Sequence, residues 1–180
     1  MAIKSPGLRI SAPADGIPYG RGFYQLEEDA LYLPVEYPDG RHRFHSYIDS
    51  ESVSLHIDRD GRLIFVEVML PRRQWKAKKD FVPPEDIAEA DIRFSDFRQE
   101  LKSPHVFCNP AKNRLFISFS RQPSVNSLYL ATNLIAQVTA DNHLAGLWAF
   151  DIIDDMAGRR IASWRRSIRR KTATQTVGVG

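Results

Sequence analysis

Glu67 is the residue of this sequence whose type and surroundings suit acid–base chemistry. It lies in an otherwise apolar stretch, and the hairpin predicted around it places Ser54 opposite and His56 on the diagonal. A carboxylate buried among apolar side chains has a perturbed pKa, as many catalytic acids do. If that face is exposed, Glu67 is an ordinary surface carboxylate. An enzyme that uses Glu67 is therefore only the third functional hypothesis.

A non-enzymatic binding or interaction module is the leading hypothesis. Its candidate ligand-binding residues are His56, Glu67 and Trp148, and Trp148 takes the position of Glu67 in the second half of the chain. We predict no catalytic residue and no cofactor. The expected partners are a protein of another kind, a second copy of this chain, or nucleic acid.

A metal site is the next chemistry to weigh, because three histidines and two aspartates lie near one another in sequence. Residues three apart on a strand point to opposite faces, so His42 and His45 cannot easily share a metal. Asp58 and Asp60 are explained by a turn, and no spacing matches a zinc or calcium pattern. The sequence predicts no metal site.

Two segments combine a tryptophan with basic residues. They contain Trp75, Lys76, Lys78 and Lys79 in one and Trp164, Arg165, Arg166, Arg169 and Arg170 in the other. Such residues can hold phosphates and stack on bases, although no base-reading motif accompanies them. Alternatively, each tryptophan seals a sheet edge while the basic side chains stay in water. Nucleic-acid association through residues 72–79 and 159–171 is the second functional hypothesis.

The element that would position Glu67 is a hairpin with its turn at Asp60-Gly61. Asp-Gly between alternating apolar residues is a strong hairpin signal, because both central positions of a type I′ turn need a positive φ. Centring the turn there pairs Val53 with Val68, Leu55 with Val66 and Ile57 with Ile64. All three pairs share one face, so turn chemistry and hydrophobic pattern predict the same register.

The same hairpin recurs with its turn at Asp141-Asn142. Its predicted pairs are Leu134 with Ala149, Ala136 with Leu147 and Val138 with Ala145. Leu8 to Ser11 likewise resembles Ile92 to Ser95, and the Leu-Tyr-Leu segment that begins at Leu31 has a Leu-Phe-Ile counterpart. Four matches in one order predict that residues 8–70 and 92–153 are two copies of one β unit.

The predicted fold is mainly β: two homologous antiparallel β-meanders packed as a sandwich or barrel about a pseudo-two-fold axis. Residues 71–91 form a linker with a short helix over 84–90, since Pro84 followed by acidic residues is typical of a helix start. The segment 124–138 also suits a helix, and the repeat favours strands. Residues 154–180 form a basic helix and flexible tail, with an apolar stripe of Ile161, Trp164 and Ile168.

Several of these residues resemble a family of short prokaryotic proteins defined only as a domain of unknown function. The resemblance rests on Tyr24-x4-Asp29-Ala30-Leu31-Tyr32-Leu33, on Ile57-Asp58-Arg59-Asp60-Gly61-Arg62-Leu63 and on Val66-Glu67-Val68. The first copy has Phe65 where the family has glycine, and the second has Trp148 where the family has glutamate. The second copy also lacks Asp-Ala and Asp-Gly. The resemblance implies a small β unit and no particular activity.

Composition limits the class of protein further. The one cysteine, Cys108, excludes an internal disulfide and suits a reducing cytosol. No signal peptide or apolar span is visible, so we expect a cytoplasmic protein without a membrane partner. Seven of the 25 basic residues follow Met156, which leaves 18 basic against 22 acidic residues in the preceding chain. The basic character therefore belongs to the C-terminal segment.

Overall fold

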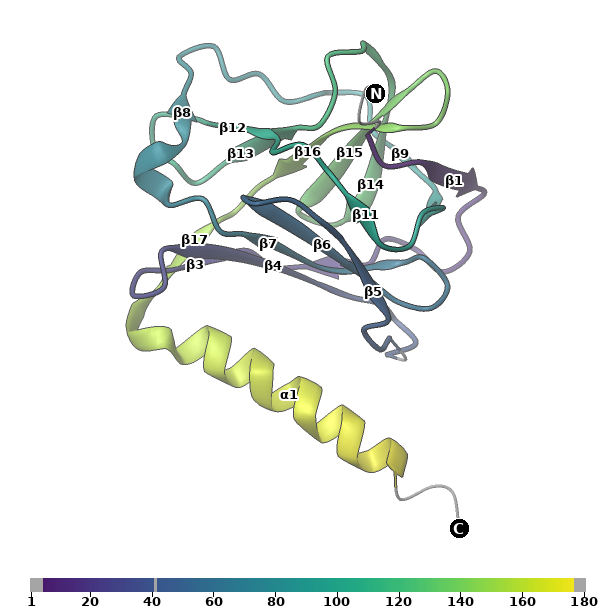
Figure 1. Ribbon diagram of the computed structural model, residues 1–180, viewed down its shortest axis with the longest axis vertical. Coiled ribbons are helices and arrows are strands. Elements are labelled where there is room, and N and C mark those ends of the chain that lie inside the picture. Colours follow the sequence, from purple (N-terminus) through teal and green to yellow (C-terminus); the bar gives the residue numbers. More distant parts are fainter. Residues whose placement is uncertain (1–4, 41, 177–180) are drawn as a thin grey trace.

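The chain folds mainly into β-strands, with one α-helix among the described residues (Figure 1). The structure is a computed structural model that describes residues 5–40 and 42–176, with side chains up to residue 169. The prediction of a mainly β protein with a C-terminal helix is confirmed. The helix, α1 (Arg159–Thr176), includes most of the predicted segment and follows a short 3-10 turn, η2 (Met156–Gly158).

The first sheet is built around five antiparallel strands from the N-terminal half. They are β3 (Phe23–Gln25), β4 (Ala30–Glu36), β5 (Ser46–Asp49), β6 (Val53–Ile57) and β7 (Leu63–Val68), in the spatial order β3-β4-β7-β6-β5. The two-residue strand β2 (Tyr19–Gly20) also pairs with β4. Two short strands from later in the chain extend the edges in parallel: β17 (Ile153–Asp155) beside β3, and β11 (Gln99–Glu100) beside β5.

The second sheet has the same spatial order as the first. Its central strands are β12 (His105–Cys108), β13 (Leu115–Ser118), β14 (Ser124–Ala131), β15 (Leu134–Thr139) and β16 (Leu144–Ala149), ordered β12-β13-β16-β15-β14. In both sheets the second strand along the chain lies between the first and the fifth. Short parallel strands again extend the edges: β8 (Lys76–Ala77) beside β12, and β9 (Ala88–Glu89) beside β14.

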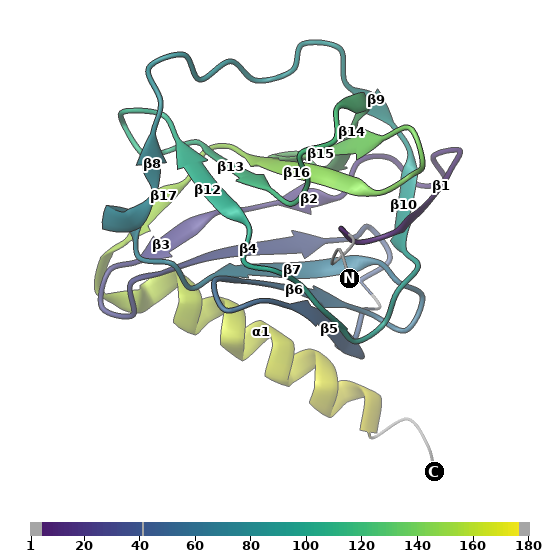
Figure 2. The same ribbon diagram turned by 45° about the horizontal axis from the view of Figure 1, so that its top comes forward.

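The two sheets lie one above the other, and a small two-stranded sheet connects them at one side (Figure 2). That sheet pairs β1 (Leu8–Ser11) with β10 (Asp91–Phe94). One cluster of buried side chains contains residues of both large sheets, including the fully buried Leu33, Val66, Ile117 and Leu147. The core is therefore shared by the two halves of the chain.

The two predicted hairpins form, each with one deviation. Val53 faces Val68 and Leu55 faces Val66 as predicted, but Ile57 faces Leu63 across a bulge. The second hairpin likewise keeps two predicted pairs and sets Val138 opposite Leu144. The register differs from the prediction because, in each hairpin, a side chain forms hydrogen bonds across the loop.

In the first loop the Asp58 carboxylate accepts hydrogen bonds from the backbone N–H of Asp60 and of Arg62, at 2.9 and 2.8 Å. In the second loop the Thr139 hydroxyl accepts the N–H of His143 at 3.0 Å. These bonds stabilise a longer loop than the predicted two-residue turn. Residues 124–131 and 134–139 are strands, as the repeat predicted.

The predicted helix over 84–90 is wrong. The linker contains the 3-10 turn η1 (Arg72–Gln74) and the strands β8 and β9, which lie at opposite edges of the second sheet. Six strand spacings of about 4.8 Å separate those edges, roughly 29 Å. The ten intervening residues span about 33 Å when all are extended, but only about 26 Å when residues 84–87 are helical. The crossing therefore requires an extended chain, whatever the local preference of Pro84.

Gly61 offers a test of how closely β10 packs on the first hairpin. Gly61 has a φ of +83°, and its carbonyl oxygen accepts a hydrogen bond from the N–H of Phe94 at 2.7 Å. A methyl group added to Gly61 would lie only 2.4 Å from the carbonyl oxygen of Phe94. We expect Gly61→Ala to lower the free energy of unfolding by about 2–4 kcal/mol through strain and the clash. Gly16 has a φ of +75° and open space around it, so Gly16→Ala should cost only about 1–2 kcal/mol. Equal losses in urea unfolding would contradict this packing.

Candidate functional site

The predicted ligand-binding residues do not all meet. His56 and Glu67 lie on the outer face of the first sheet, with Nε2 of His56 3.8 Å from a carboxylate oxygen of Glu67. Their side chains are 24% and 27% exposed. Trp148 lies on the second sheet, where it packs against Phe81 and Phe116 with ring centroids 4.8 and 4.7 Å away. His56 and Glu67 are therefore neighbours, and Trp148 is not part of their site.

The first basic segment does not offer its tryptophan to a ligand. Trp75 is only 4% exposed, its indole N–H donates to the carbonyl of Leu70 at 2.9 Å, and its ring packs edge-on against Tyr24. Lys76, Lys78 and Lys79 are exposed, and Nζ of Lys78 lies 4.0 Å from the centroid of the Phe107 ring. In this segment the tryptophan closes the core while the lysines remain in water.

The second basic segment, α1, lies across the outer face of the first sheet (Figure 1). Ile161 is 3% exposed, and the Trp164 ring packs on Phe65 with centroids 4.5 Å apart. Arg165, Arg166 and Arg169 are exposed, and the side chain of Arg170 lies outside the described part. The predicted stripe is thus buried at its N-terminal end, whereas Ile168 is 45% exposed.

Asp155 holds the start of α1. Its carboxylate accepts the backbone N–H of Arg160 at 2.8 Å and of Ile161 at 3.0 Å, and the side chain is almost fully buried. These bonds satisfy two N–H groups that a helix N-terminus leaves unpaired. Ala157, with a φ of +57°, lets the chain turn between the cap and the helix. Because Asp155 also belongs to β17, the helix is fixed to the edge of the first sheet.

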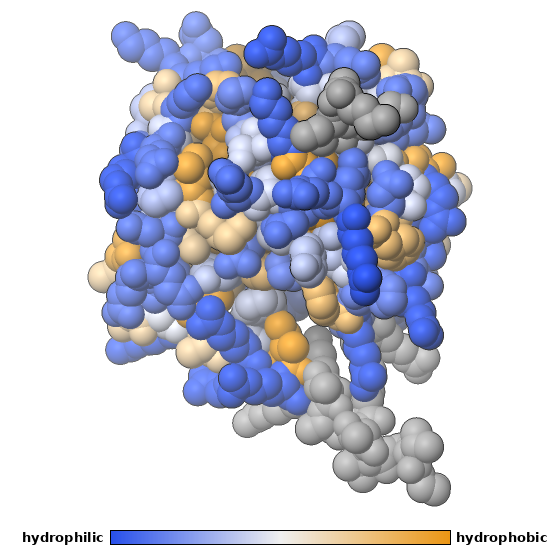
Figure 3. Space-filling model, in the orientation of Figure 1, coloured by the Kyte–Doolittle hydropathy of each residue, from blue (hydrophilic) through white to orange (hydrophobic). Residues whose placement is uncertain are grey.

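A groove of about 470 Å³ lies between α1 and the first sheet. Its apolar walls are formed by Val35, Phe44, Ile64, Phe65, Trp164 and Ile168. Its polar groups belong to Glu36, Tyr37, His42, Arg43, His56 and Ser167. In Figure 3, hydrophobic side chains (orange) lie close to the helix on a face that is otherwise mostly hydrophilic. The sequence identified His56 and Trp164 separately and considered His42 only for a metal site, and it missed Arg43 and Phe44, which complete the groove.

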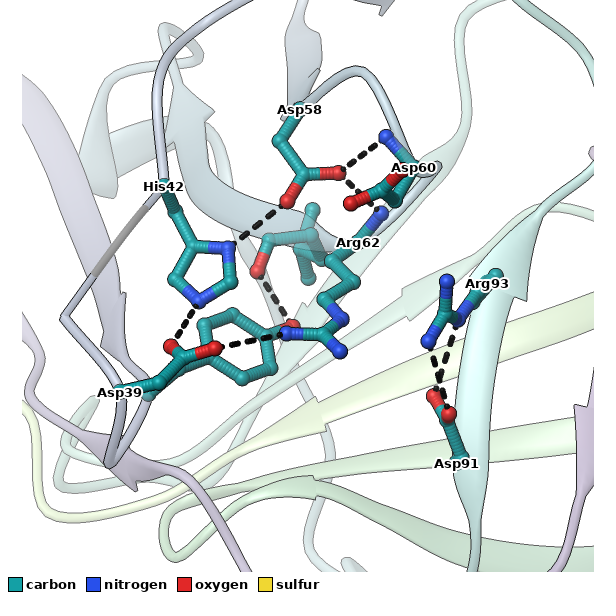
Figure 4. A network of polar contacts seen from close by, with 9 residues as sticks. Asp39, His42, Asp58, Asp60, Arg62, Asp91 and Arg93 are labelled. Carbon is teal, nitrogen blue, oxygen red and sulfur yellow. Dashed lines mark hydrogen bonds and ion pairs between the residues drawn. The ribbon is translucent and has the colours of Figure 1, made fainter. Parts of the chain in front are cut away.

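A polar network supports that loop. The imidazole of His42 lies between two carboxylates, with Nδ1 2.7 Å from Asp58 and Nε2 2.6 Å from Asp39 (Figure 4). Arg62 lies 3.4 Å from Asp39, and the Tyr37 ring packs 4.3 Å from the His42 ring. The network ties Tyr37, Asp39 and His42 to the hairpin loop, so the groove wall is anchored. His42 and Asp58 were considered as metal ligands; no group of residues suited to a metal ion occurs within the described chain.

The helix α1 is also held by a contact with a titratable group, the carboxylate of Glu28. The Tyr32 hydroxyl donates to the Glu28 carboxylate, and the guanidinium of Arg165 lies 3.3 Å from the same group. The hydrogen bond from Tyr32, followed by the charge of Arg165, holds the pKa of Glu28 below its usual range. Burial and the neighbouring Glu28 raise the pKa of Tyr32, so the phenol stays protonated and can donate.

No family model matches the sequence, and no curated protein resembles it closely enough to be counted a relative. The resemblance to a domain of unknown function therefore stays a prediction. Within residues 5–40 and 42–176, no helix is long and apolar enough to cross a membrane.

Replacing Trp164 tests whether α1 is docked. Trp164→Ala removes the contacts with Phe65 and Tyr32 and should lower the free energy of unfolding by about 1–3 kcal/mol, measured by urea denaturation. Arg166→Ala is the control, because Arg166 is exposed and has no ion pair with a described residue. It should change stability by less than about 0.5 kcal/mol. Equal effects would mean that the helix does not dock.

The Glu28 contact should make helix docking depend on pH. A lowered pKa in the folded state stabilises the protein above the ordinary pKa of about 4.5 and ceases to do so as the pH falls through the lowered value. Thermal unfolding midpoints of the protein should therefore fall more steeply below about pH 4.5 than those of Glu28→Gln. Parallel profiles for the two proteins would contradict a stabilising role of this carboxylate.

Proposed function

We propose that the chain is a non-enzymatic binding module whose ligand lies in the groove between α1 and the first sheet. The observation that carries this proposal is the groove itself. Its volume of about 470 Å³ falls within the ~300–1,000 Å³ of small-ligand sites, and its lining is apolar and aromatic with a few polar groups. This volume and this lining are typical of a ligand-binding site rather than of a gap left by imperfect packing.

Catalysis through Glu67 has less support. Glu67 does not line the groove, and its near neighbours include His56, Tyr32 and Arg165. A catalytic carboxylate has to reach the substrate, whereas Glu67 lies where the helix packs on the sheet. The thiol of Cys108 is buried, and burial raises its pKa, which is the opposite of an activated nucleophile.

We also propose that the two sheets are copies of one unit, packed as a β-sandwich about a pseudo-two-fold axis. Three features support this duplication: the identical strand order, the equivalent bulges and the reciprocal strand contacts. β10 bonds to the first loop through Phe94, and β1 bonds to the second loop through Leu8 and the carbonyl of Asn142 at 2.8 Å. Each unit thus has its hairpin loop capped by the other unit's companion strand.

A bulky side chain in the groove tests the proposed site. Ser167 lines the groove, and Ser163 is exposed on the same helix outside it. Ser167→Trp should fill the groove, while Ser163→Trp adds the same side chain in water. We expect native mass spectrometry to detect a retained small ligand, or binding of an added anilinonaphthalene sulfonate probe, for the wild type and Ser163→Trp but not for Ser167→Trp. Equal binding by all three would exclude the groove.

A further inference from the structure

A continuous row of aromatic rings runs along the groove and ends just beyond it, at Tyr47. Phe65, His56 and Tyr47 are direct neighbours across β7, β6 and β5. Trp164 extends the row from the helix, and Phe44 joins it from the loop before β5. The centroids from Trp164 to Phe65, His56, Phe44 and Tyr47 are 4.5, 4.8, 5.4 and 6.2 Å apart in turn. Three of these rings come from strands in register, so the row is built on rigid elements.

The rings become more exposed away from the helix. Phe65 is 7% exposed under α1, whereas Phe44 is 55% and Tyr47 is 48% exposed. The rings of Phe44 and Tyr47 are nearly parallel, at 13° to each other. Phe44, which lines the groove, and Tyr47, which lies beside Phe44 just outside the lining, therefore present their surfaces to water. A ligand that stacks on rings in series fits this arrangement better than an aliphatic chain does.

The charges around the groove favour an anion. Glu36, the acidic residue of its lining, is already paired with Arg21 at 2.7 Å, and Glu67, outside the lining, lies 3.8 Å from His56. Arg43, in contrast, is exposed on the groove wall and has no ion pair with any described residue. Cations without partners attract a negatively charged ligand over about 10 Å at moderate salt.

We infer that the groove binds single-stranded nucleic acid, with bases stacked on Phe44 and Tyr47 and a backbone phosphate beside Arg43. The inference rests on the proposed function and names its ligand. Aromatic surfaces in series beside unpaired cations are the means by which proteins hold single strands. In a duplex, each base pair is stacked between its neighbours, which hides the faces that would stack on the protein, and a neutral sugar leaves Arg43 unused. The proposed base-stacking residues lie at 44–47 and not in the basic segments 72–79 and 159–171; Trp75 is buried, and segment 159–171 contributes only one wall of the groove, through Trp164, Ser167 and Ile168.

The experiment uses the full chain and a fluorescein-labelled oligothymidylate of about 12 nucleotides, within the ~4–16 nucleotides of known single-strand sites. Binding is followed by fluorescence anisotropy. We expect Phe44→Ala and Tyr47→Ala each to weaken Kd by about tenfold, as loss of one base stack does. Tyr19→Ala is the matched control, because Tyr19 is 55% exposed but is not part of the aromatic row, and it should leave Kd unchanged.

The proposed contact between Arg43 and a phosphate is tested separately, by the salt dependence of binding. Arg43→Ala should reduce the slope of log K against log salt by about 0.7, the value for one phosphate of a single strand. Arg121→Ala removes an exposed arginine from the second half of the chain and should leave the slope unchanged. A duplex of the same length should compete poorly.

Two results would overturn the inference. If the oligonucleotide does not bind while Ser167→Trp still abolishes small-ligand or probe binding, the groove is a binding site for another ligand and the proposed function stands. If the oligonucleotide binds but is lost only on replacing Lys76, Lys78 and Lys79, nucleic acid binds elsewhere. Failure of the proposed function itself is distinct, since Ser167→Trp would then change no binding at all.

Discussion

The exchange of edge strands between the two halves is the constraint on which the rest of the structure depends. After β7 the chain crosses to the second sheet and pairs β8 with β12, and after β16 it crosses back and pairs β17 with β3. Each sheet is therefore completed by chain from the other half, which also covers edges that would otherwise expose unpaired backbone groups. Neither half retains all its edge strands without the other, and the shared core follows from this arrangement.

The same crossings decide what lies over the outer face of each sheet. β8 leads into the extended residues 78–87, which pass to β9 and place Phe81 against Trp148. β17 leads into α1, which covers Phe65 and Tyr32. An extended chain lies close to its sheet, whereas a helix has a diameter of about 10 Å and diverges from a twisted sheet. The groove consequently occurs on the helical side, which explains why His56 lies in it and Trp148 does not.

The chemistry of the groove depends on positions that the two halves do not share. The second half has Trp148 at the position of Glu67, and Gly146 where the first half has Phe65, so that Phe116 packs against Gly146. In the first half, Phe65 takes part in the aromatic row and Glu67 is paired beneath the helix. Similar backbones thus carry a packed outer face in one sheet and an aromatic groove in the other. The His42 network adds the wall that the sheet alone cannot supply.

The sequence by itself determined the two central hairpins, their register except at the bulges, and the helix with its apolar stripe, because these depend on neighbouring residues and short periods; the short edge strands were not predicted. Only the tertiary structure decided that residues 84–90 are extended, that Trp75 is buried, and that Asp155 caps α1 after a turn at Ala157. The groove, too, was decided only by the tertiary structure. Phe44, His56 and Trp164 are brought to one groove by strand pairing and by the crossing into β17, and no local pattern encodes a contact such as that of Phe65 with Trp164, 99 positions apart.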